Sequence, residues 1–189
     1  MIRTFLAFEL PNEIKNQVIE FKDSLKNFSY HKIKWVEDEN LHITLQFIGD
    51  IKETDAKDLS KNFGAIFADL PPFEFSFSKL ELVPGREPRI IWLKFETESK
   101  EIYKKHKKIK SYLYEKGYKI DKKPLKFHLT LGRIKRELDF YEIESFLKQS
   151  LSVENFLIDD ITFFKSFLTP KGPIYTPLEN YILKKIKEQ

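Results

Sequence analysis

The amino-acid sequence contains no cysteine, no apolar run of transmembrane length and no low-complexity segment or linker. A chain without cysteine forms neither a disulfide nor a thiolate metal site, and we expect it in the cytoplasm. The opening MIRTFLAFELP is only faintly like a signal sequence, because its apolar stretch is as short as a strand and is interrupted by Glu9 and Pro11. We therefore expect neither a disulfide-framed secreted protein nor a membrane protein.

The residues that are present suit a globular protein with a sizeable core. Of the 189 residues, 15% are aromatic, including 18 phenylalanines, and 33% are charged. Disordered chains are poorer in aromatic residues, so this composition favours a folded protein. The length and the lack of any dividing segment predict one domain, or two closely packed lobes, over residues 1–189.

The formal net charge of +4 and the isoelectric point of about 9.0 favour polyanionic partners such as nucleic acid. The densest basic run, KKHKKIK at 104–110, lies where apolar residues keep helical spacing, so its lysines fall mostly on the outer face of a helix. Two interpretations of this run stay open. We favour a solvated helix surface over a patch that attracts phosphate.

Hydrophobic periodicity predicts an α+β protein with mostly antiparallel sheets. Helices are expected at about 12–28, 53–69, 99–116 and 139–150. Strands are expected at 2–10, 31–36, 41–49, 73–83, 89–96, 118–120, 125–134, 154–168 and 174–184. The turn composition of PGREP predicts a hairpin between two of these strands, and Gly117 is expected to end the third helix in a left-handed cap.

One short pattern occurs twice, as LHITLQFI at 41–48 and as FHLTLGRI at 127–134. Both copies read histidine, apolar residue, threonine, leucine. Because strand side chains alternate between faces, His42 shares a face with Thr44, and His128 shares a face with Thr130. Random placement gives two such copies on the order of once in ten thousand chains of this composition. The pattern therefore indicates function rather than two ordinary buried histidines.

Two histidines presented alike suit a reaction in which one proton is removed and another is delivered. Their ordinary pKa of about 6.5 allows one ring to be neutral and the other charged, as a general base and a general acid require. Cleavage of a phosphoester is such a reaction. The hydroxyls of Thr44 and Thr130 are placed to donate hydrogen bonds to the phosphate oxygens as their charge grows. The residues alone do not decide which histidine is the acid.

With these motifs, the sequence resembles the 2H phosphoesterases, and within them the RNA 2′,3′-cyclic phosphodiesterases, also called 2′-5′ RNA ligases. The similarity covers nearly the whole chain, through RTFLAFELP, IKWVEDENLHITLQFIGD, VPGREPRIIWL, PLKFHLTLGRIK and KSFLTPKGPIY. It implies a single bilobal α+β domain over residues 1–189. In that fold, two mostly antiparallel sheets form a central groove and the helices pack on the outside.

The resemblance also implies an activity and residue roles. The expected reaction is hydrolysis of an RNA terminal 2′,3′-cyclic phosphate to a 2′-phosphate, without a metal ion or other cofactor. By motif position, His42 is the proton donor to the 3′ leaving oxygen, and His128 is the proton acceptor that activates water. Thr44, Thr130 and Arg133 are the expected phosphate-binding residues, and the guanidinium of arginine is a natural phosphate ligand.

Arg133 poses a geometric question, because strict alternation from His128 places it on the opposite face of the strand. It reaches the groove only if Gly132 introduces a bulge or a bend, or if the strand has already ended. A salt bridge at the rim or between the lobes is the alternative use of this side chain.

Other residues near the motifs are interpreted as structural. His31 and His106 lack a threonine two residues later and are expected at surface or boundary positions. Trp35 and Phe47 are left out of the site as core residues, because alternation places Phe47 on the apolar face of its strand. The stretch at 169–177, TPKGPIYTP, is expected to form a structural hairpin rather than a binding loop. Without cysteine or an H-E-x-x-H pattern, no metal site is expected.

The expected partner is RNA with a 2′,3′-cyclic phosphate end, or a small cyclic phosphoester. We expect a monomer, although no sequence pattern fixes the oligomeric state. Two alternatives stay open. In the first, the same groove joins RNA ends through a 2′-5′ linkage, with a 5′-hydroxyl in place of water, although water at about 55 M favours hydrolysis. In the second, the chain is a non-catalytic protein that only holds an RNA end.

Overall fold

A computed structural model of the chain describes residues 1–29, 32–84, 87–121, 123–170 and 172–184, with the side chains of residues 28 and 29 excepted. The helices are α1 (Asn12–Ser29), α2 (Ala56–Phe67), α3 (Lys100–Glu115) and α4 (Phe140–Leu147). The strands are β1 (Ile2–Phe8), β2 (Ile33–Trp35), β3 (Ile43–Ile51), β4 (Phe73–Val83), β5 (Ile90–Glu96), β6 (Phe127–Ile134), β7 (Phe156–Ile158), β8 (Asp160–Leu168) and β9 (Pro173–Ile182). Short 3-10 turns, Asp38–Asn40 and Glu53–Asp55, precede β3 and α2.

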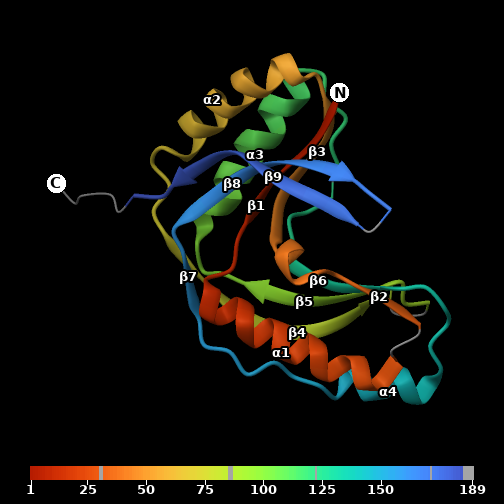
Figure 1. Ribbon diagram of the computed structural model, residues 1–189. Helices are drawn as coiled ribbons and strands as arrows, with labels where there is room; N and C mark the ends of the chain where they lie inside the picture. The colour runs from red at the N-terminus through yellow and green to blue at the C-terminus, as the bar shows by residue number, and fades with distance from the viewer. Residues whose placement is uncertain (30–31, 85–86, 122, 171, 185–189) are drawn as a thin grey trace.

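The described strands pair antiparallel in the order β7-β4-β5-β6-β3-β1-β8-β9, with β2 beside β6. The structure joins the two predicted sheets into one continuous sheet of the nine described strands. The register pairs only Ile43 with Leu129 between β3 and β6, so this junction is narrow. One lobe holds β2 and β4 to β7, and the other holds β1, β3, β8 and β9. Figure 1 shows α1 and α4 covering the first lobe, and α2 and α3 covering the second. This is the bilobal α+β arrangement that the sequence predicts.

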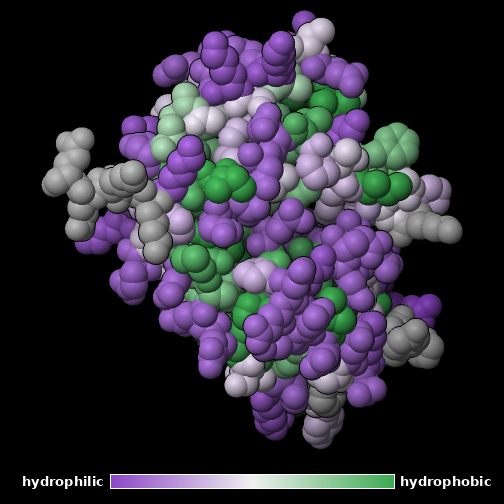
Figure 2. All heavy atoms as spheres, turned by 60° about the vertical axis from the view of Figure 1, so that its left-hand side comes forward, coloured by the Kyte–Doolittle hydropathy of each residue, from purple (hydrophilic) through white to green (hydrophobic). Residues whose placement is uncertain are grey.

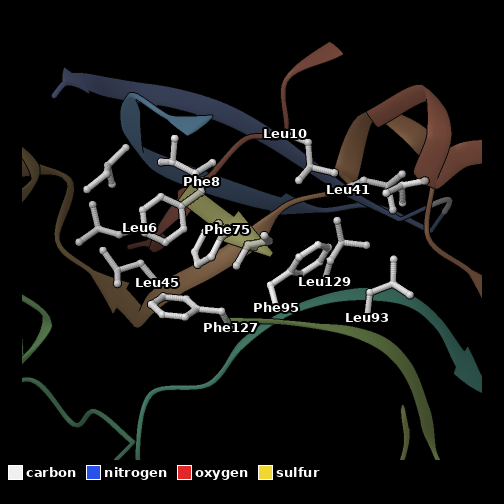
Figure 3. Close-up of a cluster of buried hydrophobic side chains, with 14 of the residues drawn as sticks. Leu6, Phe8, Leu10, Leu41, Leu45, Phe75, Leu93, Phe95, Phe127 and Leu129 are labelled. Carbon is white, nitrogen blue, oxygen red and sulfur yellow. The ribbon is translucent and has the colours of Figure 1, made fainter. Parts of the chain in front are cut away.

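One apolar core runs through both lobes. Figure 3 shows buried side chains from β1, β3, β4, β5 and β6 pointing toward one another between the strands. The Phe75 ring lies 4.8 Å from that of Phe127 and 5.5 Å from that of Phe8, measured between centroids. Phe127 directly precedes His128 and is 2% exposed. Close packing of the inner face of β6 therefore leaves the motif residues on its other face.

The helix ends follow the expected local rules. Gly117 has a φ of +85°, and the N–H of Tyr118 donates to the carbonyl of Leu113 at 3.0 Å, which is the predicted left-handed cap of α3. Asp139 and Glu142 form a capping box at the start of α4. Figure 2 shows a face on which hydrophilic side chains predominate and apolar ones form small separate patches. Within the described residues, no helix is long and apolar enough to cross a membrane.

Some local predictions are wrong. Residues 118–120 form no strand, and the run 154–168 is two strands that separate at Asp159. β7 pairs with β4 in one lobe, whereas β8 pairs with β1 and β9 in the other. Periodicity reports which side chains are buried, not which strand they pair with, so it cannot reveal this change of lobe. The prediction for His31 and part of the PGREP turn lie outside the described residues.

Candidate active site

The two motif strands border a cavity of about 550 Å³ between the lobes. Its walls come from β1, β2, β3, β6 and the hairpin of β8 and β9. The structure brings all the residues selected from the sequence to this cavity: His42, Thr44, His128, Thr130 and Arg133. The motifs lie far apart in the chain, and they meet because β3 and β6 are neighbours in the sheet.

The two histidines are anchored in the same way. Nδ1 of His42 lies 2.7 Å from the carbonyl oxygen of Asn40, and Nδ1 of His128 lies 3.0 Å from that of Lys126. Each anchor is the carbonyl two residues earlier in the chain. Because a carbonyl only accepts hydrogen bonds, Nδ1 carries the proton in both rings. Nε2 is therefore the nitrogen that gains or loses a proton.

The surroundings of His42 restrict its ring. Its Nε2 lies 3.1 Å from the hydroxyl of Thr44, its motif partner. The ring also lies 5.1 Å from the Phe5 ring and 5.2 Å from the Tyr175 ring, which it meets edge to face. These contacts come from β1 and β9, so the lobe that carries β3 also encloses its histidine.

His128 has a different environment. Its ring lies 4.1 Å from the indole of Trp92 on β5. The indole Nε1–H donates to the Glu81 carboxylate on β4 at 2.7 Å, so three neighbouring strands hold this group together. Among the described residues, no hydrogen bond involves Nε2 of His128, in contrast to Nε2 of His42.

Burial lowers the pKa of both histidines below the ordinary value. The carbonyls that anchor the rings oppose this effect, because they stabilise the charged form. The carboxylate of Glu81 also raises the pKa of His128, whereas positive charge on His128 lowers the pKa of His42. Both shifts favour the neutral form of the ring, and a proton on one histidine disfavours a proton on the other.

Both motif strands contain a bulge at the same motif position. In β3, positions 44 and 46 pair with adjacent residues of β1, so Leu45 is an extra residue. In β6, positions 130 and 132 pair with adjacent residues of β5, so Leu131 is an extra residue. After a single extra residue, each later side chain points to the face opposite to the one that strict alternation predicts, until another irregularity follows. The side chains that follow the leucine of each His-x-Thr-Leu motif therefore point to the face opposite to the one that strict alternation predicts.

These bulges determine which face of the strand two side chains occupy. Arg133 meets the condition set by the sequence, because the bulge precedes it, and its exposed side chain lines the cavity. Phe47 follows the equivalent bulge in β3 and is 50% exposed on the same cavity, so its interpretation as a core residue is wrong. Trp35 packs against the core as expected, but it also lines the cavity.

A buried histidine supports the bulge in β3. Gln46 is 6% exposed, its amide donates to the carbonyl of Phe47 at 2.7 Å, and its Oε1 lies 2.9 Å from Nε2 of His106 on α3. Burial, together with the charge of Lys110, lowers the pKa of His106 to about 4. His106 is therefore neutral and buried, and the prediction of a surface or boundary position is wrong. Its place in the apolar spacing of the helix was the available signal.

The predicted hairpin at 169–177 is present and also forms a cavity wall, through Gly172, Pro173 and Tyr175. The Asn40 side chain donates to the carbonyl of Pro173 at 2.9 Å, which ties the hairpin to the segment before β3. Lys22, buried on α1, donates to the carbonyl of Val36 at 2.7 Å in that segment. These contacts hold the carbonyl that anchors His42.

The cavity wall is mainly cationic. Its charged residues are Arg3, Lys34, Glu37, Arg133 and Lys135. Arg3 pairs with Asp50 on the neighbouring strand, with 3.4 Å between Nε and Oδ1. Within the described part of the chain, no three His, Asp or Glu side chains gather in a group able to hold a metal ion. The wall is therefore suited to an anion.

Comparison with known proteins identifies the family. The family model for LigT-like phosphoesterases matches residues 8–92. An RNA 2′,3′-cyclic phosphodiesterase of Aquifex aeolicus is 32% identical, covering 97% of this chain and 98% of the relative. One of Archaeoglobus fulgidus is 31% identical, covering 94% and 98%. A crystal structure from Thermus thermophilus superposes with a TM-score of 0.81 at 25% identity, covering 96% of this chain and 97% of that one.

The chain belongs to the LigT-like phosphoesterases, which are 2H phosphoesterases, and its curated relatives are RNA 2′,3′-cyclic phosphodiesterases. The predicted family and bilobal fold are thereby confirmed, as is the prediction of an enzyme that cleaves phosphodiesters.

Proposed function

We propose that this enzyme hydrolyses the 2′,3′-cyclic phosphate at an RNA end to a 2′-phosphate and a 3′-hydroxyl, by acid and base catalysis without a metal ion. One observation carries the proposal. Two histidines, one from each lobe, line one cavity with Nδ1 fixed on a backbone carbonyl, which leaves both Nε2 atoms for proton transfer. The names of the curated relatives support the RNA end as substrate.

In the proposed reaction, Nε2 of His128 takes a proton from water as the water oxygen attacks the phosphorus. The bond from phosphorus to the 3′ oxygen breaks, and Nε2 of His42 delivers its proton to that oxygen. The hydroxyls of Thr44 and Thr130 donate hydrogen bonds to the non-bridging oxygens, and Arg133 offsets their charge. The two histidines exchange protonation states, and solvent restores them.

The environments of the histidines favour this direction of proton flow. Nε2 of His128 has no hydrogen bond among the described residues, and the negative charge of Glu81 stabilises the imidazolium that forms. Positive charge on His128 lowers the pKa of His42, so the first proton transfer makes His42 a stronger acid. An anionic phosphate between the rings raises both pKa values, which allows the complex to carry the proton that His42 delivers.

The test is turnover of an RNA oligonucleotide with a 2′,3′-cyclic phosphate end, in EDTA, across pH 5 to 9. The wild type is expected to form a 2′-phosphate with a bell-shaped pH dependence. His42→Ala and His128→Ala are each expected to lower kcat about a hundredfold or more. The thermal unfolding of each variant, followed in parallel, shows whether the fold is intact.

Other outcomes support the alternatives. Joining of the cyclic end to an added 5′-hydroxyl strand identifies a 2′-5′ RNA ligase, and tight binding without product identifies a protein that only holds RNA ends. A reaction that requires an added metal ion contradicts the proposed mechanism. The cytoplasmic location and the monomeric state stay predictions, which cell fractionation and light scattering test.

A further inference from the structure

Three cations on the cavity wall have no carboxylate partner among the described residues. They are Lys34 on β2, Arg133 on β6 and Lys135 directly after β6, and all three are exposed. Glu37 lines the same cavity, but neither it nor any other described carboxylate lies within ion-pair distance of them. Arg3, in contrast, has its pair with Asp50. The unpaired charge is therefore concentrated on the wall that β2 and β6 form.

Two of these cations lie directly opposite each other. The register of β2 and β6 pairs Lys34 with Arg133, and like charges at opposed positions destabilise a strand pair. β2 has only three residues, so this pair is a large part of its contact with β6. Phosphate groups bound beside the two side chains offset this repulsion. The pairing is therefore better suited to a ligand-bound state than to the free protein.

Arg133 and Lys135 follow the second motif along β6 and the residues directly after it. Arg133, which serves the same phosphate as Thr130 in the proposed reaction, is followed two residues later by Lys135. With a rise of about 3.3 Å per residue, Arg133 and Lys135 are about 7 Å apart along the chain. A single RNA strand can present successive phosphates at a similar interval. The row therefore leads from the motif histidine toward the end of the groove at β2.

We propose that Lys34 and Lys135, on either side of Arg133, bind the internucleotide phosphates on the 5′ side of the cyclic end. The inference rests on the proposed function and narrows its substrate class to RNA oligonucleotides over mononucleotides. Lysine side chains reach a flexible backbone without a fixed geometry, so this subsite recognises phosphate rather than sequence. Binding through it releases counterions and depends on salt concentration.

The test compares two substrates with the same terminal nucleotide: a 2′,3′-cyclic mononucleotide and a short RNA oligonucleotide with a cyclic end. In Lys34→Ala/Lys135→Ala, KM for the oligonucleotide is expected to rise about tenfold, while the mononucleotide keeps its kcat and KM. For the oligonucleotide, the dependence of log kcat/KM on log salt concentration is expected to become shallower by about 0.7 for each lysine removed.

Lys107→Ala is the matched control, because it removes an exposed lysine of the basic run on α3, away from this cavity. It is expected to leave both substrates unchanged. The subsite is overturned if the double variant loses kcat/KM equally for the two substrates, or loses it for neither. It is also overturned if Lys107→Ala shows the same loss as the double variant. A wild type that turns over neither substrate overturns the proposed function instead, so the two failures are distinguishable.

Discussion

At the scale of single residues, the pKa of His128 depends on a carboxylate two strands away. The Trp92 ring lies against His128, and its indole N–H holds Glu81, whose negative charge raises the pKa of the histidine. Glu81→Gln keeps an oxygen to accept from the indole but removes the charge. We expect the pKa of His128 to fall, so that the acidic limb of the kcat/KM profile moves to lower pH.

The measurement is the pH dependence of kcat/KM with a cyclic mononucleotide. Glu74→Gln is the control, because it removes an exposed carboxylate from the same strand at a distance from Trp92. An acidic limb that does not move in Glu81→Gln, or one that moves equally in Glu74→Gln, contradicts this role of Glu81.

The site residues that could be predicted from the sequence are those whose relative positions are set by alternation within one strand. His42 and Thr44 share a face by alternation alone, and the repetition of the pattern identifies the second pair. Trp92 and Tyr175 were missed because they reach the histidines from other strands. Their contacts depend on register and on the closure of a hairpin, and neither is encoded in local spacing.

At the scale of elements, the bulges limit what alternation predicts. Alternation describes β6 correctly up to Leu131 and β3 up to Leu45, and it fails immediately after each. Gly132 signalled an irregularity in β6, but no residue type signals the one in β3. The sequence therefore places Arg133 at the groove on the condition that Gly132 introduces a bulge, whereas alternation alone places Phe47 on the wrong face.

Gly132 has a second role, which predicts a stability effect. A Cβ atom at this position would lie 2.7 Å from Cγ2 of Ile33 and 3.3 Å from Cε3 of Trp35. Gly132→Ala therefore forces β2 away from β6, and β2 carries Lys34. We expect the free energy of unfolding to fall by about 1–3 kcal/mol, with a loss of kcat/KM for RNA.

Gly64→Ala on α2 provides the comparison for this variant. A Cβ atom there comes no closer than 3.5 Å to the Tyr181 ring, an ordinary contact, and alanine favours the helix. Urea unfolding of the two variants measures the difference in stability. If Gly132→Ala is as stable as Gly64→Ala, the close approach of β2 to Gly132 does not constrain the fold.

At the scale of the whole molecule, the order of elements was enough to predict the α+β class, because helices and paired strands follow from periodicity. The order of strands in the sheet was not predictable, since β1 pairs with β3 near it and with β8 near the far end of the chain. One apolar cluster includes residues of both lobes. This continuity supports the prediction of one bilobal domain over residues 1–189.

Because of that shared core, the ionisation of one buried group affects the stability of the whole molecule. The folded-state pKa of His106 is about 4, below the ordinary value of about 6.5 that applies in the unfolded chain. Between these values, the unfolded state binds a proton that the folded state does not bind. The stability associated with a neutral His106 is therefore fully present above about pH 6.5 and is lost as pH falls toward 4.

His106→Gln tests this contribution, because the glutamine amide can donate to Gln46 as Nε2 of His106 does, yet it does not titrate. The free energy of unfolding is measured in urea at several pH values between 4 and 7. We expect the wild type to lose about 3 kcal/mol more than the variant over that interval, since each pKa unit corresponds to about 1.4 kcal/mol. Other titrating groups cancel in the difference. Parallel curves would show that His106 accepts a proton in the folded state as readily as in the unfolded chain, and that Gln46 and the bulge it supports tolerate the charge.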